Sequence, residues 1–199
     1  MFLATTADQE FWNKDEKILF LGEWCKVFDQ KQVWGKLNYE VLPYHWDDRK
    51  KLYEDYKYLD VIYEKKLEEM AEQLNSFHGV NYSNRYWRIV VGPWLYLFVE
   101  ILFDRYLSIR AAIDSGKVSN TWIPSIPANG LVPIDSLYYK ARCIADDYNQ
   151  FLYGRIIEAL GGVSYQIKSA LSSSNSTNDF YENPTVLFDK TLAQKILLE

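Results

Sequence analysis

Residues 17–22, KILFLG, decide the fold class of this 199-residue chain. The four apolar residues between Lys17 and Gly22 follow one another without a polar interruption, which is typical of a strand that a parallel sheet buries on both faces. Residues 2–6 (FLATT) form a similar run, and residues 39–43 (YEVLP) predict a third strand that ends at its proline. We therefore expect a helix-rich α/β fold with parallel strands.

The longest helix is predicted from a periodic pattern. From Leu52 to Phe77 apolar residues recur at steps of three or four, and charged residues occupy the opposite face, as on one amphipathic helix. Asp47 or Asp48 is expected to cap its start, and Gly79 follows its end.

Other helices are predicted over residues 93–115, with a proline in the first turn, and over residues 138–160. The proline-rich residues 118–133 between them are interpreted as an ordered loop. Residues 171–179 (LSSSNSTND) have low complexity and are expected to be mobile. Residues 187–198 predict a final helix.

Composition excludes some classes of protein. A formal net charge of −5 and a pI of about 5.2 argue against general nucleic-acid binding, which needs a basic surface. The two cysteines have no metal-ligand spacing and indicate reduced thiols in a reducing compartment. The N-terminus lacks the pattern of a signal peptide. The most apolar run, residues 89–103, is shorter than the roughly 20 residues of a membrane-spanning helix and predicts a core helix.

Polar and aromatic residues follow the first two predicted strands. Gly22, Glu23 and Trp24 come directly after the run 17–22, and Thr5 and Thr6 close the run before it. Ligands in open α/β sheets bind at the carboxyl ends of strands, so Glu23 is a candidate general base and the other four are candidate substrate ligands. The alternative is a glycine-initiated turn with an exposed acid. Neither common glycine-rich phosphate loop occurs in the sequence.

A second candidate cluster is residues 45–49, HWDDR. His45, Asp47 and Asp48 offer an imidazole and two carboxylates for acid–base chemistry, and Arg49 could bind a polar ligand. The alternative is structural, because acids at a helix N-terminus complement the helix dipole without any function.

A third cluster lies in residues 85–95, RYWRIVVGPWL. Arg85, Trp87 and Arg88 combine guanidinium groups with an aromatic ring, which suits sugars and phosphates but equally suits packing against another domain. We expect the three clusters to converge on one cleft.

Other combinations are weaker. Cys25 as a nucleophile would need a neighbouring base that nothing in the sequence links to it. Asp146 and Asp147 could offer oxygen atoms to a hard cation, but on a continuous helix they would point about 100° apart. We therefore predict no metal site.

Several segments together resemble a bacterial family of transferases encoded in O-antigen and other surface-polysaccharide gene clusters. In one of these segments, residues 146–149 (DDYN), the third position is tyrosine, where tryptophan is commoner in the family. The segments cover about the first 160 residues in the family's order: residues 2–6 (FLATT), 18–25 (ILFLGEWC), 42–49 (LPYHWDDR), 85–88 (RYWR), 92–95 (GPWL) and 146–149 (DDYN).

The resemblance implies a Rossmann-like half of a two-domain, GT-B-like transferase. Members of the family are longer than this chain, so the resemblance implies either a fragment or a separately encoded N-terminal half. We expect an α/β domain over residues 1–165 and a flexible segment with the start of a further element over residues 166–199. In such enzymes the C-terminal half usually binds the nucleotide-linked donor and the N-terminal half shapes the acceptor side. The isolated chain is then expected to be inactive and to hold no cofactor.

The partners implied are a sugar or polysaccharide-precursor acceptor and a C-terminal transferase domain, in the cytoplasm at the inner face of the membrane. An alternative function is a non-catalytic docking module that packs against a partner domain through its aromatic-rich face.

Overall fold

The protein contains a five-stranded, all-parallel sheet with the strand order β3-β2-β1-β4-β5. We describe it from a computed structural model, in which residues 1–125, 133 and 135–169 are described. The strand order matches the first five positions of a Rossmann sheet. The strands are β1 (Phe2–Ala4), β2 (Ile18–Phe20), β3 (Tyr39–Val41), β4 (Asn120–Pro124) and β5 (Ser164–Lys168).

The three strands predicted from sequence are confirmed, whereas the interpretation of residues 118–133 as a loop is wrong at its start. Thr121 and Ile123 of β4 are buried and alternate with less buried neighbours. The sequence did not reveal this alternation, because the strand covers few residues and its last position is a proline. β5 was missed because its polar residues are mostly exposed and pair only with β4. The remainder of the predicted loop, residues 126–132 and 134, lies outside the described residues.

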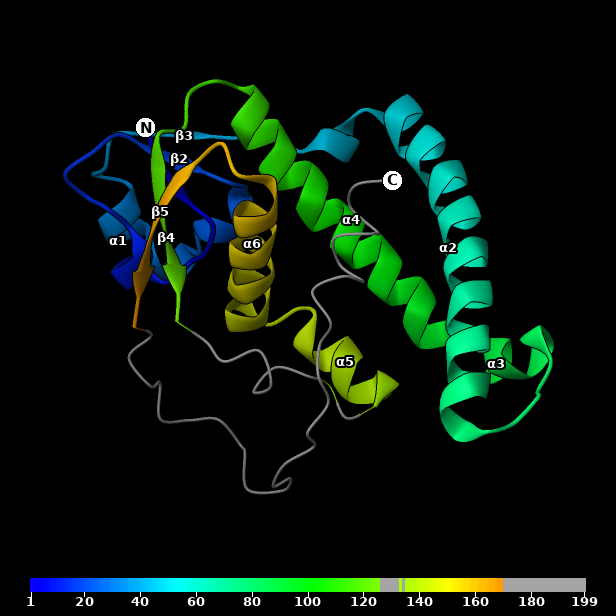
Figure 1. Cartoon of the computed structure of the whole chain (residues 1–199). Coiled ribbons are helices and arrows are strands. Elements are labelled where there is room, and N and C mark those ends of the chain that lie inside the picture. The colour runs from blue at the N-terminus through cyan, green and yellow to red at the C-terminus, as the bar shows by residue number, and fades with distance from the viewer. Residues whose placement is uncertain (126–132, 134, 170–199) are drawn as a thin grey trace.

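Helices make up most of the rest of the described chain, and Figure 1 shows α6 beside one face of the sheet and α1 on the opposite side. The short 3₁₀ helices are η1 (Gln9–Phe11), η2 (Glu23–Cys25), η3 (Phe28–Gln30) and η4 (His45–Asp47). The α-helices are α1 (Lys31–Trp34), α2 (Arg49–His78), α3 (Asn84–Val90), α4 (Gly92–Asp114), α5 (Ser136–Arg142) and α6 (Asp146–Leu160).

The amphipathic helix is confirmed as α2. The Asp48 side chain accepts hydrogen bonds from the backbone N–H groups of Lys50 and Lys51, and Gly79 ends the helix in the left-handed region at φ 64°. Of the apolar face, Leu59 and Leu67 are buried. Both pack in one cluster with Leu95 and Val99 of α4. Tyr63 and Met70, which share the apolar spacing of the helix, contact that cluster only as partly buried side chains.

The single helix predicted over residues 138–160 is wrong, because the chain forms two helices with a break between them. Ala145 adopts an extended conformation at the break. The Asn149 side-chain amide donates to the backbone carbonyls of Cys143 and Ala145, at 3.0 and 2.9 Å. Such side-chain bonds offer the backbone an alternative to helix continuation, and α6 therefore starts afresh at Asp146.

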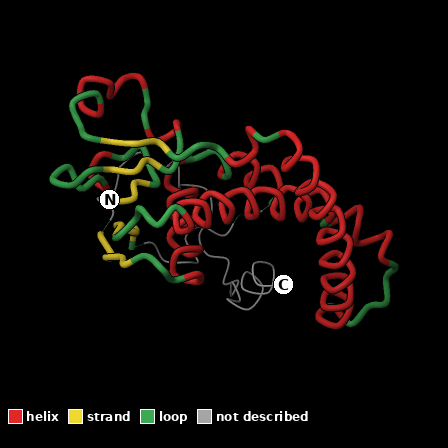
Figure 2. Tube along the Cα trace, turned by 90° about the horizontal axis from the view of Figure 1, so that it is seen from above, coloured by secondary structure: helices red, strands yellow, loops and turns green. Residues whose placement is uncertain are grey.

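Helices α2 and α3 and the first half of α4 form a helical arm that extends away from the sheet (Figure 2). The second half of α4 belongs to the main core, where Leu102, Ile109 and Ala112 join the residues of the sheet. Among the described residues no single helix is long and apolar enough to cross a membrane, and α3 and α4 meet that test only as a pair bent by 70°. The predicted mobile segment 171–179 and final helix 187–198 lie outside the described residues.

Candidate functional site

The largest cavity of the candidate site opens at the carboxyl ends of β1 and β2, and we call it the strand-end cavity. It has a volume of about 450 Å³. Its walls come from the loops after β1 and β2, from α4, and from the α5–α6 junction. The lining residues are Ala7, Trp24, Val27, Arg105, Cys143, Ile144, Asp146, Asn149 and Tyr153.

One wall of the strand-end cavity is aromatic. The rings of Trp24 and Tyr153 are stacked with an interplanar angle of 10° and centroids 6.4 Å apart. A side chain at Gly22 would prevent this, because a Cβ atom there would lie only 2.1 Å from the Trp24 ring. Gly22 is therefore needed for the close approach of the indole. Trp24 keeps 39% of its surface exposed, and a flat, partly exposed indole is suited to stacking against a ligand ring.

The strand-end cavity also has an acidic lining residue, Asp146. The Thr6 hydroxyl, just beyond β1, donates a hydrogen bond to Oδ2 of Asp146, the first residue of α6. Burial of its carboxyl group raises the pKa of Asp146 above the ordinary value of 3.8, although the Thr6 hydrogen bond opposes the rise. A carboxylate with a raised pKa next to a cavity is a candidate for proton transfer.

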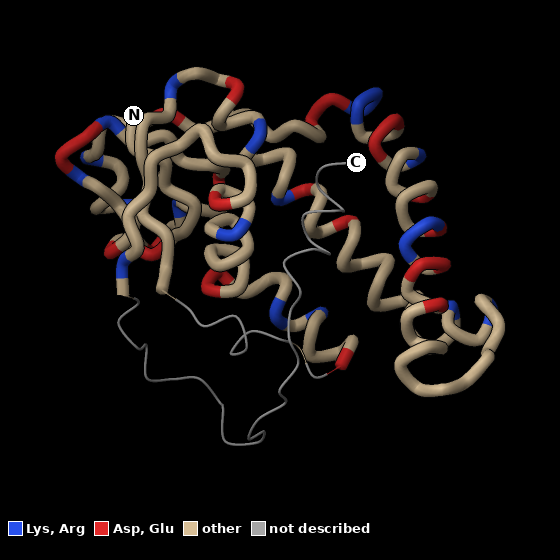
Figure 3. The backbone as a smooth tube through the Cα atoms, viewed as in Figure 1, with Lys and Arg blue, Asp and Glu red and all other residues tan. Residues whose placement is uncertain are grey.

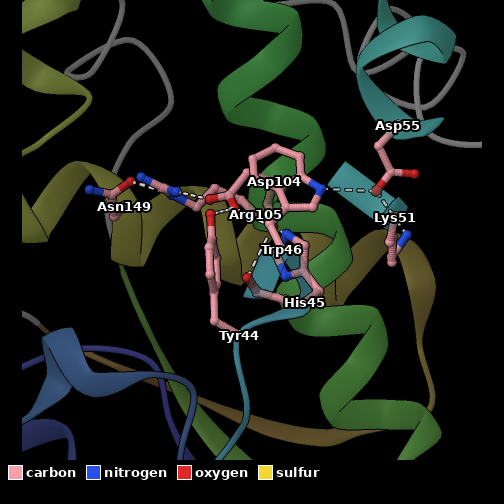
Figure 4. Close-up of polar contacts among 9 residues, drawn as sticks. Tyr44, His45, Trp46, Lys51, Asp55, Asp104, Arg105 and Asn149 are labelled. Carbon is pink, nitrogen blue, oxygen red and sulfur yellow. Dashed lines mark hydrogen bonds and ion pairs between the residues drawn. The ribbon is translucent and has the colours of Figure 1, made fainter. Parts of the chain in front are cut away.

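Behind the strand-end cavity, a chain of hydrogen bonds and ion pairs joins α6, α4 and the loop after β3 (Figure 4). Arg105 Nε donates to Asn149 Oδ1 at 2.8 Å, and its Nη1 donates to Asp104. Asp104 Oδ1 accepts from the Tyr44 hydroxyl at 2.8 Å. Nε2 of His45 lies 3.2 Å from the same oxygen, in an orientation that leaves it without a well-directed hydrogen bond.

Asp104 is the charged centre of this network. Burial opposes its ionisation, but His45, Arg105 and Tyr44 together hold the pKa of the carboxyl below its ordinary value of 3.8. Burial and the nearby Asp104 carboxylate raise the pKa of the Tyr44 hydroxyl. Asp104 is therefore ionised at neutral pH and fixes the guanidinium of Arg105 at the edge of the cavity.

A smaller cavity of about 300 Å³ lies on the other side of the network, between α2 and α4. Asp104 and Arg105 line it together with aromatic residues that include Tyr44 and Trp46. Trp46 is held by a hydrogen bond of 2.9 Å from its Nε1 to Asp55, which also binds Lys51 (Figure 4). Arg105 is thus shared by both cavities.

The structure places the candidates of the first cluster at or beside the strand-end cavity. Trp24 lines it, Gly22 makes room for Trp24, and Thr6 binds Asp146 at its edge. Thr5 is buried next to Thr6. Glu23 points into solvent with 78% of its side chain exposed and forms an ion pair with Lys26.

The second cluster divides between structural and site roles. Asp48 caps α2, as the structural alternative proposed, and Asp47 and Arg49 are exposed. His45 contacts Asp104 and so belongs to the network behind the strand-end cavity.

The expectation that all three clusters share one cleft is wrong for the third. Figure 1 shows α3 at the end of α2 that lies farthest from the sheet. There the Trp87 indole donates to Asn75 at 2.9 Å, and Arg88 binds Glu64 through both of its terminal nitrogens. Arg85 is exposed on the same short helix. Trp87 and Arg88 therefore contact the second half of α2 and do not reach the strand-end cavity.

Sequence reasoning missed Asp104 and Arg105 as site residues. A signal was present, because this charged pair directly follows the most apolar run of the chain within the same predicted helix, and charged groups in a core helix need partners. Asp146 and Asn149 stood in a segment of family resemblance, but only their possible role as cation ligands was weighed. Within the described ranges, no group of three or more His, Cys, Asp or Glu residues could hold a metal ion.

Cys25 is not placed as a nucleophile. Its thiol is buried and donates to the Ala4 carbonyl at 3.5 Å. Burial raises its pKa to about 12, so the reactive thiolate is not formed at neutral pH.

The fold is that of an open α/β protein with an all-parallel sheet, and its mixed polar and aromatic cavity lies at the carboxyl ends of the strands, where proteins of this class usually bind their ligands. The chain belongs to the LIC12162 family of transferases, whose model matches residues 1–198. No curated protein and no solved structure matches the chain.

Proposed function

We propose that this chain forms the acceptor side of a glycosyl- or glycerophosphate-type transferase of surface-polysaccharide biosynthesis. The observation that carries the proposal is the strand-end cavity, which is lined both by a stacked aromatic pair and by a carboxyl group of raised pKa. Its volume of about 450 Å³ is within the usual range for small-molecule sites.

These lining residues suit a hydroxylated ring. The apolar face of a sugar would lie against Trp24, and its hydroxyl groups would reach Asp146 and Asn149. Arg105 contributes a guanidinium whose Nη2 is bonded to no acceptor among the described residues. That nitrogen would bind an oxygen atom of the acceptor or of the donor phosphate.

Asp146 is the proposed general base. The acceptor hydroxyl oxygen would form the new bond to the donor's transferred group as its proton passes to the Asp146 carboxylate. The bond between the transferred group and the donor nucleotide would break, and the nucleotide phosphate would leave with the bonding electrons. This assignment takes precedence over Glu23, Asp47 and Asp48, because those three carboxylates are exposed or cap a helix. His45 remains a candidate through its contact with Asp104.

The nucleotide-linked donor is assigned to a second, C-terminal domain across the cleft. The sequence has neither of the common glycine-rich phosphate loops. The arginine of the strand-end cavity, Arg105, is already paired with Asp104, and the carboxyl group of Asp146 lines the same cavity. Such a cavity favours a neutral acceptor over a free anion. The chain itself would then have no transferase activity.

Titration calorimetry with neutral sugars and with UDP-, GDP- and CDP-linked sugars tests this division of roles. We expect weak, millimolar binding of a neutral sugar and weaker or no binding of nucleotide sugars. Trp24→Ala and Asp146→Asn should each abolish sugar binding, whereas Trp34→Ala, which changes an indole outside the cavity, should not. Low-micromolar binding of a nucleotide sugar that is lost in Arg105→Ala would show that this half is the donor site.

A further inference from the structure

The end of the helical arm exposes a group of large apolar and aromatic side chains. We call it the arm tip. Phe77 and Ile89 leave 83% and 70% of their surfaces in solvent. The arm tip consists of Phe77, Tyr82, Tyr86, Ile89 and Val90, all of them exposed.

The arm tip is well structured, so its exposure does not come from a frayed end. The Asn75 side chain accepts from the Tyr82 backbone N–H at 3.0 Å and donates to the Tyr82 carbonyl at 2.9 Å. Its oxygen also accepts from the Trp87 indole. The rings of Tyr82 and Tyr86 lie 4.3 Å apart, and both contact Trp87. Asn75 and Trp87 therefore fix the loop from which these side chains project.

The charge around the arm tip differs from that of the whole chain. No Asp or Glu occurs between residues 73 and 99, although the chain has 27 acidic residues and a net charge of −5. The same stretch contains two arginines, of which Arg88 binds Glu64 and Arg85 is exposed. Figure 3 shows the loop between α2 and α3 without any charged residue. In an otherwise acidic protein, this stretch is therefore apolar, lacks acidic residues and exposes the cation Arg85.

We propose that the arm tip docks on the surface of an anionic lipid bilayer. Tyr and Trp rings prefer the headgroup region, and apolar side chains such as Phe77 and Ile89 would enter the acyl boundary. Arg85 would meet lipid phosphates, whose negative charge would repel the rest of the chain. Charge complementarity therefore favours one orientation, with the arm tip toward the lipid.

This orientation keeps the strand-end cavity away from the bilayer. Figure 1 shows the arm tip and the sheet at opposite ends of the molecule. The proposed interaction is interfacial, with apolar side chains of the arm tip at the boundary between headgroups and acyl chains. The proposal does not depend on the chemistry assigned to the strand-end cavity.

Cosedimentation of the chain with vesicles provides the test. We expect binding to vesicles of phosphatidylglycerol and phosphatidylcholine, weaker binding to phosphatidylcholine alone, and a decrease as sodium chloride is raised. The double variant Phe77→Ser with Ile89→Ser should weaken binding about tenfold or more, because it removes the inserted side chains. The matched control Phe28→Ser with Val61→Ser changes side chains that are 80% and 66% exposed elsewhere and should bind like the wild type.

A second variant tests the proposal even if the double variant fails to fold. Arg85→Glu reverses one exposed charge and should weaken binding to anionic vesicles more than binding to phosphatidylcholine. Absence of wild-type binding, or equal binding by the arm-tip and control variants, would overturn the proposal. Sedimentation equilibrium showing a dimer that the arm-tip variant dissociates would assign the surface to a second copy of the chain instead.

Discussion

The Thr6 hydroxyl donates a hydrogen bond to the carboxylate of Asp146, across 140 positions of sequence. Thr6 follows the strand β1 and Asp146 begins the helix α6. The bond therefore joins the carboxyl edge of the sheet to the N-terminus of the helix that covers it, at the cavity where ligands of parallel sheets usually bind.

Replacement of Asp146 by Asn should lower the transferase activity without lowering the stability of the fold. Because burial raises the pKa of Asp146, its protonated form is favoured by folding. Its stabilising contribution is complete below the ordinary value of 3.8 and is lost as pH rises through the raised value. At pH 7, Asp146→Asn should therefore have an equal or higher melting temperature by circular dichroism.

In the proposed two-domain transferase, Asp146→Asn should lower kcat by about 10²- to 10⁴-fold, the usual contribution of a general base. Wild-type activity should also fall as pH decreases through the raised pKa of Asp146. Glu23→Gln is the control, because Glu23 is exposed and pairs only with Lys26 in the described structure. Normal activity of Asp146→Asn would show that Asp146 does not act as the general base.

Asp104 should be essential for stability. Asp104→Asn leaves the Arg105 guanidinium without its charged partner, and breaking a buried ion pair costs about 3–5 kcal/mol. Tyr44→Phe removes one hydrogen bond to the same carboxylate and should cost about 1 kcal/mol. Urea denaturation at neutral pH measures both changes. Equal effects of the two variants would contradict the central position of Asp104 in the network.

The same network predicts acid sensitivity. The pKa of Asp104 is lowered in the folded chain, so its contribution to stability is present above the ordinary value of 3.8 and is lost as pH falls through the lowered value. As pH falls below 3.8, the free energy of unfolding of the wild type should therefore decrease more steeply than that of Asp104→Asn. Denaturation curves recorded between pH 2 and pH 6 compare the two.

The sequence was sufficient for the features that depend on local pattern. The apolar run at residues 18–21 predicted the strand β2, and the apolar spacing from Leu52 to Phe77 predicted the helix α2. Asp48 caps the start of α2 and Gly79 caps its end, as the sequence indicated. The two strands β4 and β5 were missed, because each is partly polar and is stabilised by pairing with residues distant in sequence.

The candidate site was predicted only in part for the same reason. Trp24 and Thr6 follow strands, so the general rule for parallel sheets located them. Asp104 and Arg105 are carried by α4, and their roles depend on contacts with Tyr44 and Asn149 that no local pattern encodes. Arg85, Trp87 and Arg88 have a composition suited to ligands, yet their described contacts lie within the helical arm.

The packing of the helical arm gives the last prediction. Leu67 is fully buried between α2 and α4, where it joins Leu59, Leu95 and Val99. Leu67→Ala should lower the free energy of unfolding by about 2–5 kcal/mol, because it removes buried methyl groups and leaves a cavity. Leu67→Asp should be more destabilising, since it also places a charge among apolar side chains.

Val61 provides the matched control on the same helix, because 66% of its surface is exposed. Val61→Asp should change the free energy of unfolding by no more than about 0.5 kcal/mol, the usual range for surface substitutions. Urea denaturation followed by far-ultraviolet circular dichroism distinguishes the two positions. If Leu67→Asp were as stable as Val61→Asp, α2 would not be packed against α4 in solution, and the arm tip would lose the rigid support on which its exposure depends.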